Sequence, residues 1–395
     1  VAMRCSEPAV APSRRPSLLG KKPPELALLC LVQLPPSALS ERESNAFGEV
    51  AAALRAARHP FVSPALHADV AAADDQRRAV TYRRFAPLGS LKDAIHGCSD
   101  PRASYGVKYG FLERAAAAPT AAAAGAATGA AASATADGGP QHVGSALPAA
   151  KVALYGRMVL EALRFCRAAG LPCVHLHSGN VLLEDASGSG GGGGGPRSST
   201  SGGGIGGAVC VVAEVELALL RLPAYSELLA KPRLPPGGGS FRVAREVLAF
   251  GHLLFEMVTG AELTAREIAN WERALGAGAL FPGPPAAWAL LATIFLPAAG
   301  ASAAPTLVDL LADPFFSVAL PLAAPPAAPL DLHGSAAELI RAARRHYGDE
   351  VVCSPPGDAA SSAGSASPEA KPKRSKRTKP ESARRKSKQA AAAAD

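Results

Sequence analysis

Hydrophobic residues recur with the period of an α-helix in two long segments of the chain. In "ALYGRMVLEALRFCRAAGLP", Leu154, Met158 and Phe165 fall on one stripe, and Gly170 followed by Pro172 ends the pattern. In "EVLAFGHLLFEMVTG" almost every position is apolar, so no polar face is left for solvent. The first segment predicts an amphipathic helix that leads into a loop, and the second predicts a helix at the centre of the core.

The front of the chain alternates between strand and helix patterns. "ELALLCLVQL" is a short apolar run typical of a strand, and in "SNAFGEVAAALRAARHP" the residues Phe47, Val50 and Leu54 are spaced as on a helix that stops before Pro60. "AVTYRRFAPLGSLKDAIHG" then predicts a strand, a turn and a short helix with Ser90 as its N-cap. The fold class expected from these patterns is α+β, with a small front part and a mainly helical rear part.

Low-complexity segments divide the chain. Residues 115–150 are mostly Ala, Gly, Ser and Thr, and residues 187–207 are almost all Gly and Ser, so we expect both to be inserts within one folded domain. The foldable remainder is roughly 270 residues, enough for a single core. The expected parts are a disordered N-terminus (1–24), the folded domain (25–320), a C-terminal extension (321–353) and a disordered basic tail (354–395).

Neither the hydropathy nor the cysteines of the chain indicate export or membrane insertion. No apolar run approaches the roughly 18 to 20 residues that a membrane-spanning helix needs. Residues 1–24 contain no apolar block of signal-peptide length, and the seven cysteines include no Cys-x-x-Cys pair. We expect a protein of a reducing, cytoplasmic compartment without a transmembrane segment.

The positive charge of the chain is concentrated near its C-terminus. Residues 371–388, "KPKRSKRTKPESARRKSK", contain ten Lys or Arg and one Glu, a charge of +9 against +8 for the whole chain, which leaves −1 for the rest. Such a tail attracts phosphate-bearing partners without sequence specificity. It is a solubility tail, a nuclear-localisation signal, or a tether to nucleic acid or acidic surfaces, and it adds a membrane-peripheral or nuclear location to the expected cytoplasmic one.

The order of these patterns resembles the C-terminal lobe of a protein kinase. The shared features are an amphipathic helix, a loop ending in Asn, two short strands, the buried "FGHLLFEM" helix and the closing "PTLVDLLADPFF". Within that superfamily, "RRFAPLGSLKDAI", "GLPCVHLHSGNVLL" and "FGHLLFEM" are similar to the PX-domain-containing kinase-like proteins and the Slowpoke channel-binding proteins. The resemblance covers most of residues 42–318. It implies a protein kinase-like two-lobe fold over residues 25–320, with a reduced N-lobe.

The resemblance also implies which residues occupy the catalytic positions of a kinase. Counting back from Asn180, at the magnesium-binding Asn position, His175 stands where the catalytic Asp belongs, and Glu214 stands for the metal-binding acid of Asp-Phe-Gly. An imidazole lacks the fixed negative charge of Asp beside the nucleophile. The extra methylene of Glu displaces its carboxylate by about 1.5 Å where magnesium requires tight octahedral geometry. We therefore expect catalysis and metal binding to be weak or absent.

The front lobe departs further from the kinase pattern. No Gly-x-Gly-x-x-Gly occurs before residue 60, and the strand that should bear the nucleotide lysine has Gln33, so Glu49 lacks the Lys with which it would pair. Glu246 takes the place of a structural Asp, and Ala304 takes the place of an Arg. The phosphate clamp, the base and one internal ion pair are altered whereas the hydrophobic frame is retained, which is the pattern of a pseudokinase.

Each candidate site residue also has a structural interpretation. His175 and His177, an i, i+2 pair without a third nearby ligand, either bind a metal or have structural roles. Asn180 either ligates magnesium or braces its loop by hydrogen bonds. Glu214 is either a metal ligand or a solvated or hydrogen-bonded acid.

Two functions of different classes are consistent with these residues. The first is a pseudokinase that acts as a binding or scaffold module for protein partners in signalling or trafficking. The second is a divergent Ser/Thr protein kinase that binds ATP and magnesium through Asn180 and Glu214 and transfers phosphate with atypical residues. A PX domain, which the name of the family implies, is not recognisable in this chain.

Deleting residues 371–388 is expected to leave the melting temperature unchanged, because a disordered polycation contributes charge but no core. Retention on heparin should weaken, and the difference from the intact chain should shrink as salt is added. Thermal unfolding and heparin elution of the two chains provide the comparison. A lower melting temperature after the deletion would mean that the tail is docked on the domain.

Overall fold

The protein is described by a computed structural model. The expected N-terminus 1–24 and insert 187–207, and nearly all of the insert 115–150 and the tail 354–395, lie outside the residues that the structure describes. The described residues form a mixed helix and strand fold, as predicted, around a large buried apolar cluster. They are 27–35, 39–73, 76–98, 100, 102–103, 144–185, 208–235, 239–277 and 281–354.

The front of the chain forms a three-stranded antiparallel sheet. Its strands, in sheet order, are β1 (Ala27–Leu34), β4 (Gln76–Arg84) and β3 (His67–Ala73). β1 and β4 were predicted from their patterns, whereas β3, "HADVAAA", has too little apolar alternation to be recognised. β3 forms because it pairs with β4 along its whole length. Ala79, Thr81 and Arg83 lie on the buried face of β4.

Helix α1 (Glu41–Ala57) packs against β3. It begins three residues before the predicted segment, because Ser40 and Glu43 form a capping box. Its buried stripe contains Phe47, Val50 and Leu54, as predicted. The helix therefore supplies much of the front part of the core.

A second small sheet connects the front of the chain to the rear. Its strands, in sheet order, are β2 (Val62–Ser63), β6 (Ala208–Ala213) and β5 (Val181–Asp185). β5 is antiparallel to β6, with Val181 opposite Val212. The residue before β5, Asn180, and the residue after β6, Glu214, therefore lie at the same edge of this sheet.

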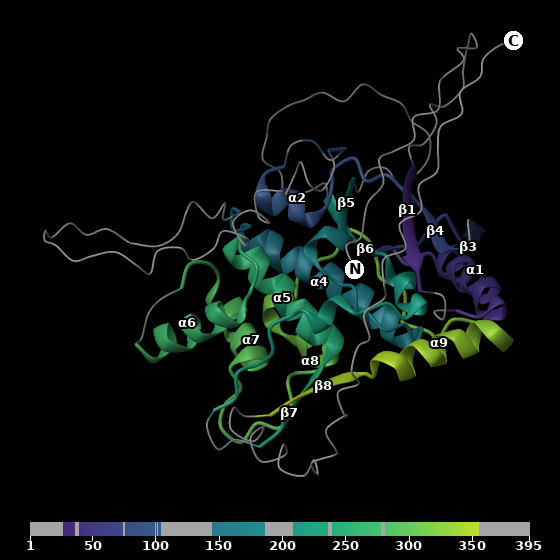
Figure 1. The fold of residues 1–395 in the computed structure, drawn as a ribbon. Helices are drawn as coiled ribbons and strands as arrows, with labels where there is room; N and C mark the ends of the chain where they lie inside the picture. Colours follow the sequence, from purple (N-terminus) through teal and green to yellow (C-terminus); the bar gives the residue numbers. More distant parts are fainter. Residues whose placement is uncertain are drawn as a thin grey trace, which may run out of the picture. The chain divides into compact units, whose positions relative to one another are not determined.

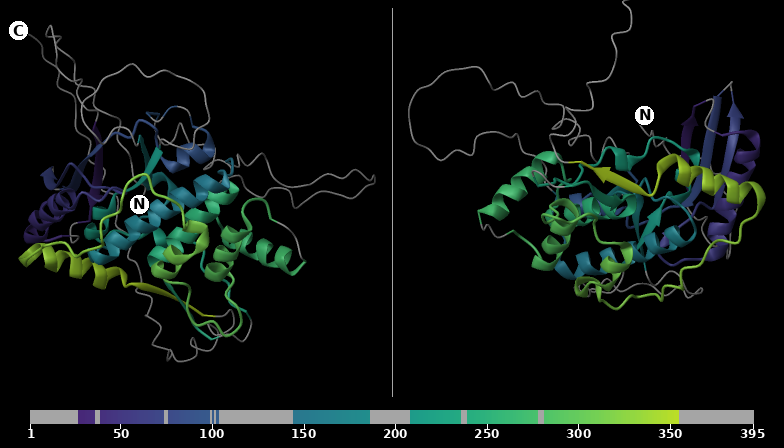
Figure 2. Two further views of the ribbon diagram at one scale, coloured as in Figure 1. Left: turned by 180° about the vertical axis from the view of Figure 1, so that it is seen from behind. Right: turned by 90° about the horizontal axis from the view of Figure 1, so that it is seen from below.

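The rear of the fold is helical, and α5 is at its centre. Its helices are α2 (Leu91–His96), α4 (Ala149–Ala168), α5 (Arg245–Thr259), α6 (Ala265–Gly276), α7 (Pro285–Phe295) and α8 (Leu307–Ala312). α5 packs against α4 and α7, and α4 also packs against α8 (Figures 1 and 2). Twelve of the fifteen residues of α5 are buried, so its prediction as a central helix is confirmed. The predicted N-cap of α2, Ser90, is confirmed by a capping box with Asp93.

The C-terminal extension has secondary structure that its sequence pattern did not predict. α9 (Gly334–Tyr347) lies beside α1, and β8 (Glu350–Cys353) pairs with β7 (Phe241–Ala244) just before α5 (Figure 1). The hydroxyl of Tyr347 donates a hydrogen bond of 2.7 Å to the carbonyl oxygen of Leu222. The extension thus packs on the same core as the preceding residues. None of the described helices is long and apolar enough to cross a bilayer.

Leu254→Asp should lower the free energy of unfolding by roughly 3 to 5 kcal/mol, because it leaves an unpaired carboxylate in the core. Leu254 is completely buried in α5, and that loss is a large part of the stability of a domain. Urea denaturation of the soluble fraction measures the change. Val308→Asp in α8, at a side chain that is 71% exposed, is the control and should be nearly neutral. Equal stability of the two variants would refute the central position of α5.

Candidate functional site

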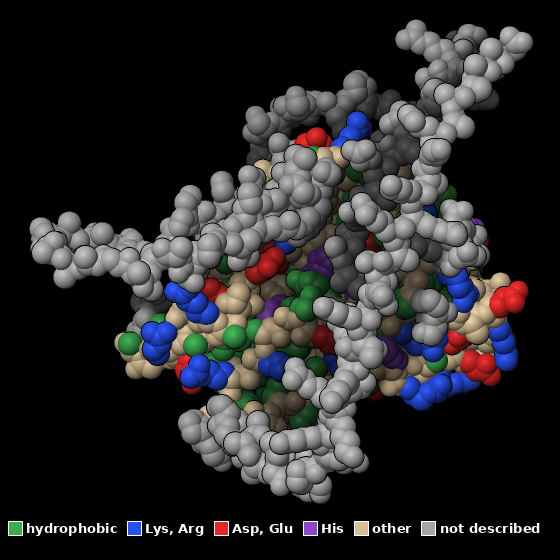
Figure 3. All heavy atoms as spheres, in the orientation of Figure 1, with side chains coloured by type: hydrophobic (Ala, Val, Ile, Leu, Met, Phe, Trp, Pro, Cys, Tyr) green, Lys and Arg blue, Asp and Glu red, His purple; other side chains and the backbone are tan. Residues whose placement is uncertain are grey.

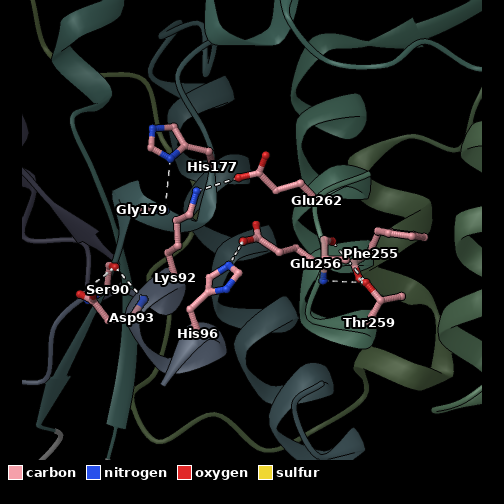
Figure 4. Close-up of polar contacts among 11 residues, drawn as sticks. Ser90, Lys92, Asp93, His96, His177, Gly179, Phe255, Glu256, Thr259 and Glu262 are labelled. Carbon is pink, nitrogen blue, oxygen red and sulfur yellow. Dashed lines mark hydrogen bonds and ion pairs between the residues drawn. The ribbon is translucent and has the colours of Figure 1, made fainter. Parts of the chain in front are cut away.

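The loop that precedes β5 is held by its own hydrogen bonds. Residues Ser178–Asn180 form one turn of 3-10 helix, and Nδ1 of His177 accepts a hydrogen bond of 3.1 Å from the backbone N–H of Gly179 (Figure 4). The side-chain Nδ2 of Asn180 donates to the carbonyl oxygen of His175 over 3.1 Å. The turn therefore keeps its shape without any ligand.

The structure brings together the three residues predicted at the base and metal positions. Asn180, which is buried, bonds through its side chain to the carboxyl group of Glu214 as well as to the backbone of His175. Glu214 adopts a left-handed backbone conformation (φ 61°), which is strained for a residue with a side chain. We call His175, Asn180 and Glu214 the Asn180 cluster.

His175 is buried and uncharged near neutral pH. Burial lowers the pKa of its imidazole to about 4, and its Nε2 has no hydrogen-bond partner among the described residues. Burial also lowers the pKa of His177 to about 3, with a smaller contribution in the same direction from the positive charge of Lys92. Two neutral rings bring no fixed charge to the place where a kinase has its catalytic carboxylate.

The acid at the metal position is also poorly suited to staying ionised. Burial raises the pKa of the Glu214 carboxyl above its usual value, and the nearby Glu216 carboxylate acts in the same direction. The positive charge of Arg83 and the hydrogen bond from Asn180 act against this shift. Glu214 is thus a partly buried, hydrogen-bonded acid in the present arrangement.

A buried ion pair beside the cluster was not anticipated from the sequence. The guanidinium of Arg83 on β4 contacts the carboxylate of Glu216, in the 3-10 helix Val215–Leu220 that follows β6. The two side chains are 1% and 0% exposed, and Nη1 of Arg83 also donates to the carbonyl oxygen of Ser63 over 3.1 Å. Strand alternation could have indicated that Arg83 is buried, because it is two residues from Thr81 and therefore on the same inward face of β4.

The residues expected near a nucleotide do not face the cluster. Gln33 is exposed, and alternation along β1 puts it on the face opposite to the buried Val32 and Leu34. Glu49 is exposed on α1. Glu246, expected in place of a structural Asp, is in the first turn of α5 and pairs with Arg167 at 3.0 Å.

A magnesium ion does not fit the residues as they are arranged. Glu214 and Glu216 each have one enclosed oxygen without a hydrogen-bond partner among the described residues, which by itself would suit a cation. However, the guanidinium of Arg83 already contacts Glu216, and Asn180 presents its N–H groups. In the described part of the chain, no group of three or more His, Cys, Asp or Glu residues could hold a metal ion. Magnesium needs about six oxygen ligands in near-octahedral geometry, and this set does not supply them.

On the outer side of the loop, α2 makes an ion pair with Glu262, just after α5, and a His–Glu contact with α5 itself. Lys92 Nζ lies 2.7 Å from a Glu262 carboxylate oxygen, and His96 Nε2 lies 3.6 Å from Glu256 (Figure 4). A pocket of about 290 Å³ adjoins these groups, and His177 contributes to its wall. The loop therefore lies against α2 and also lines this pocket.

The chain is similar to a group of kinase-like proteins, although no protein-family model matches it. It is 28% identical over 285 residues to "Probable inactive serine/threonine-protein kinase slob1" of Dictyostelium discoideum, covering 72% of this chain and 40% of the relative. It is 31% identical over 121 residues to the Slowpoke-binding protein of Drosophila melanogaster (30% and 18%). It is 32% identical over 111 residues to the PX domain-containing protein kinase-like protein of Mus musculus (28% and 15%).

These similarities confirm the family resemblance inferred from the sequence motifs. The chain spans less than half the length of each of these relatives.

The free energy of unfolding should fall as the pH is lowered from about 6.5 to about 4, because the unfolded chain binds protons on histidines that remain neutral in the fold. His175→Gln removes one such group, so the slope of stability against pH should decrease by about 1.4 kcal/mol per pH unit in that window. Urea titrations at several pH values measure the slope. Asn270→Gln, at an exposed residue that does not titrate, should leave it unchanged. Identical slopes for both variants would contradict the burial of His175.

Proposed function

We propose that this chain is a protein-kinase-like domain that does not transfer phosphate and acts by binding other proteins. The observation that carries the proposal is the Asn180 cluster, in which the Asn180 side chain is bonded to the backbone of His175 and to the carboxyl group of Glu214. His175 is buried and neutral, and the amide of Asn180 is used by His175 and Glu214. Such a cluster holds a loop in place but offers neither a carboxylate to a substrate hydroxyl nor a set of oxygen ligands to magnesium.

The proposal includes a two-lobe kinase-like arrangement. In this interpretation, β1, α1, β3 and β4 correspond to a reduced N-lobe and α4 to α8 correspond to a helical C-lobe. The order of the elements along the chain supports it, as does the position of Asn180 and Glu214 at one edge of the small sheet between them. The similarity to proteins named as kinases supports it independently.

ATP and magnesium are proposed to bind weakly or not at all. A kinase holds the phosphates with a lysine on a front strand, whereas the corresponding Gln33 is uncharged and exposed. The guanidinium of Arg83 is directed to Glu216 and the carbonyl of Ser63, not to solvent. Without a phosphate cation and a metal, little remains to attract a triphosphate.

Partner binding is the function that remains for such a domain. Two relatives are named as probable inactive kinases and one as a Slowpoke-binding protein, and these names support a scaffold in signalling or trafficking over a divergent kinase. The outer face of α9 carries exposed Arg341, Arg344 and Arg345, and Figure 3 shows side chains of both charges on that side. The basic segment 371–388 would add attraction to acidic surfaces or nucleic acid, and with it a membrane-peripheral or nuclear location.

Radiolabelled phosphate transfer to generic basic and acidic substrates should stay near background for the wild type, His175→Ala and Glu214→Ala alike, with magnesium or manganese. The two substitutions should not lower the activity further, because the wild type already lacks groups that phosphate transfer requires and such losses are not additive. A parallel thermal-shift titration with ATP should leave the melting temperature unchanged. An active protein kinase is the positive control, and Glu350→Ala, at an exposed position, is the matched variant. Strong transfer by the wild type that both site variants abolish would establish an active kinase instead.

A further inference from the structure

We propose that Arg83 is a built-in counter-ion for Glu214 and Glu216, and that it takes the place that a divalent cation would otherwise fill at these two acids. The inference rests on the proposed function in one respect, the assignment of Glu214 to the metal position of a kinase. It gives a physical reason why the site is stable without a metal ion or a nucleotide.

The guanidinium of Arg83 is fixed by three separate segments of the chain. It projects from β4, donates through Nη1 to the carbonyl oxygen of Ser63 in β2, and contacts Glu216 just after β6 through Nη2. Because Arg83 and Glu216 are almost completely buried, neither can exchange its partner for water. The pair is therefore a permanent part of the fold and cannot swing aside to admit a ligand.

The same positive charge also acts on the acid at the metal position. Glu214 is two residues before Glu216 and has one enclosed carboxylate oxygen, and the positive charge of Arg83 lowers its pKa against the opposing effect of burial. One guanidinium thus contacts the carboxylate of Glu216 and acts at longer range on the acid of Glu214. A divalent cation bound to the free oxygens of Glu214 and Glu216 would lie beside this guanidinium in a region of low dielectric, where like charges repel strongly.

The arrangement distinguishes a shared counter-ion from an ordinary buried ion pair. If Arg83 serves both acids, its removal leaves them without a counter-ion, and the vacated space lets their free oxygens, together with water molecules, hold a cation. Removal of Glu216 alone leaves Arg83 opposite Glu214, which is a milder change. An ordinary pair would respond equally to the loss of either partner.

The test compares Arg83→Gln, Glu216→Gln and the double variant in the full chain, with Arg84→Gln as the matched control. Arg84 is the next residue on β4 and is exposed. Melting temperatures are measured with and without MgCl₂ or MnCl₂, and Mn²⁺ affinity is measured from the electron paramagnetic resonance signal of free Mn²⁺.

We expect no response of the wild type or Arg84→Gln to either ion. Arg83→Gln should melt at a lower temperature than Glu216→Gln, should be stabilised by Mn²⁺, and should bind Mn²⁺ at least about tenfold more tightly than the wild type. The double variant should melt above Arg83→Gln and bind Mn²⁺ less tightly, because one of the two acids is neutral.

Two results would overturn the proposal. One is Mn²⁺ binding by the wild type as tight as by Arg83→Gln, and the other is equal destabilisation by Arg83→Gln and Glu216→Gln without any response to Mn²⁺. If Arg83→Gln does not fold, the wild-type Mn²⁺ titration and the stability of Glu216→Gln and the double variant still decide the matter. In that case a double variant that also fails to fold while Glu216→Gln is stable supports the role of Arg83. Wild-type Mn²⁺ binding without phosphate transfer would reject the counter-ion and leave the partner-binding function standing.

Discussion

The complete burial of helix α5 is the constraint on which the rest of the rear fold depends. A helix with apolar residues on all sides is stable only when other elements surround it, and α4, α7 and the strand β7 do so. The two buried polar side chains of α5 also position neighbouring segments of the chain. His252 bonds through Nε2 to the carbonyl oxygen of Ala230 at 2.9 Å, and Glu256 pairs with His96 of α2. The position of the loop before β5 follows from these contacts, since α2 lies against its outer side.

Several buried polar groups beside the loop before β5 are paired by other groups of the chain itself. Asn180 bonds to His175 and Glu214, His177 accepts from Gly179, and Arg83 neutralises Glu216. Buried polar groups cost free energy unless they are paired, so each of these bonds stabilises the loop in the absence of any ligand. A kinase active site, in contrast, leaves its carboxylates available to metal ions. In the present site the carboxylate of Glu216 already contacts a guanidinium, and the amide of Asn180 is already bonded within the cluster.

The sequence predicted the elements whose patterns are local. α4 and α5 have clear helical periods, and Ser90 begins a capping box that can be recognised from four residues. β3 could not be recognised, because its alanine-rich segment is a strand only when β4 is beside it. α9 was missed for a similar reason: its buried stripe packs against α1, almost three hundred residues earlier, and against the 3-10 helix Val215–Leu220.

The same distinction applies to the site. His175 and Asn180 were selected because a motif fixes their spacing, and Glu214 because of its place after the next strand; the structure brings the three residues together. Arg83 and Glu216 are 133 residues apart, and nothing local indicates that they meet. Comparing motifs shows which kinase residues are missing from a site. It does not show which other residues supply the missing charge. Here the apolar frame stabilises the fold independently of the catalytic residues, so those residues can differ from a kinase as long as each buried charge is balanced. Arg83 balances the charge of Glu216. The position of the loop therefore does not depend on a bound nucleotide.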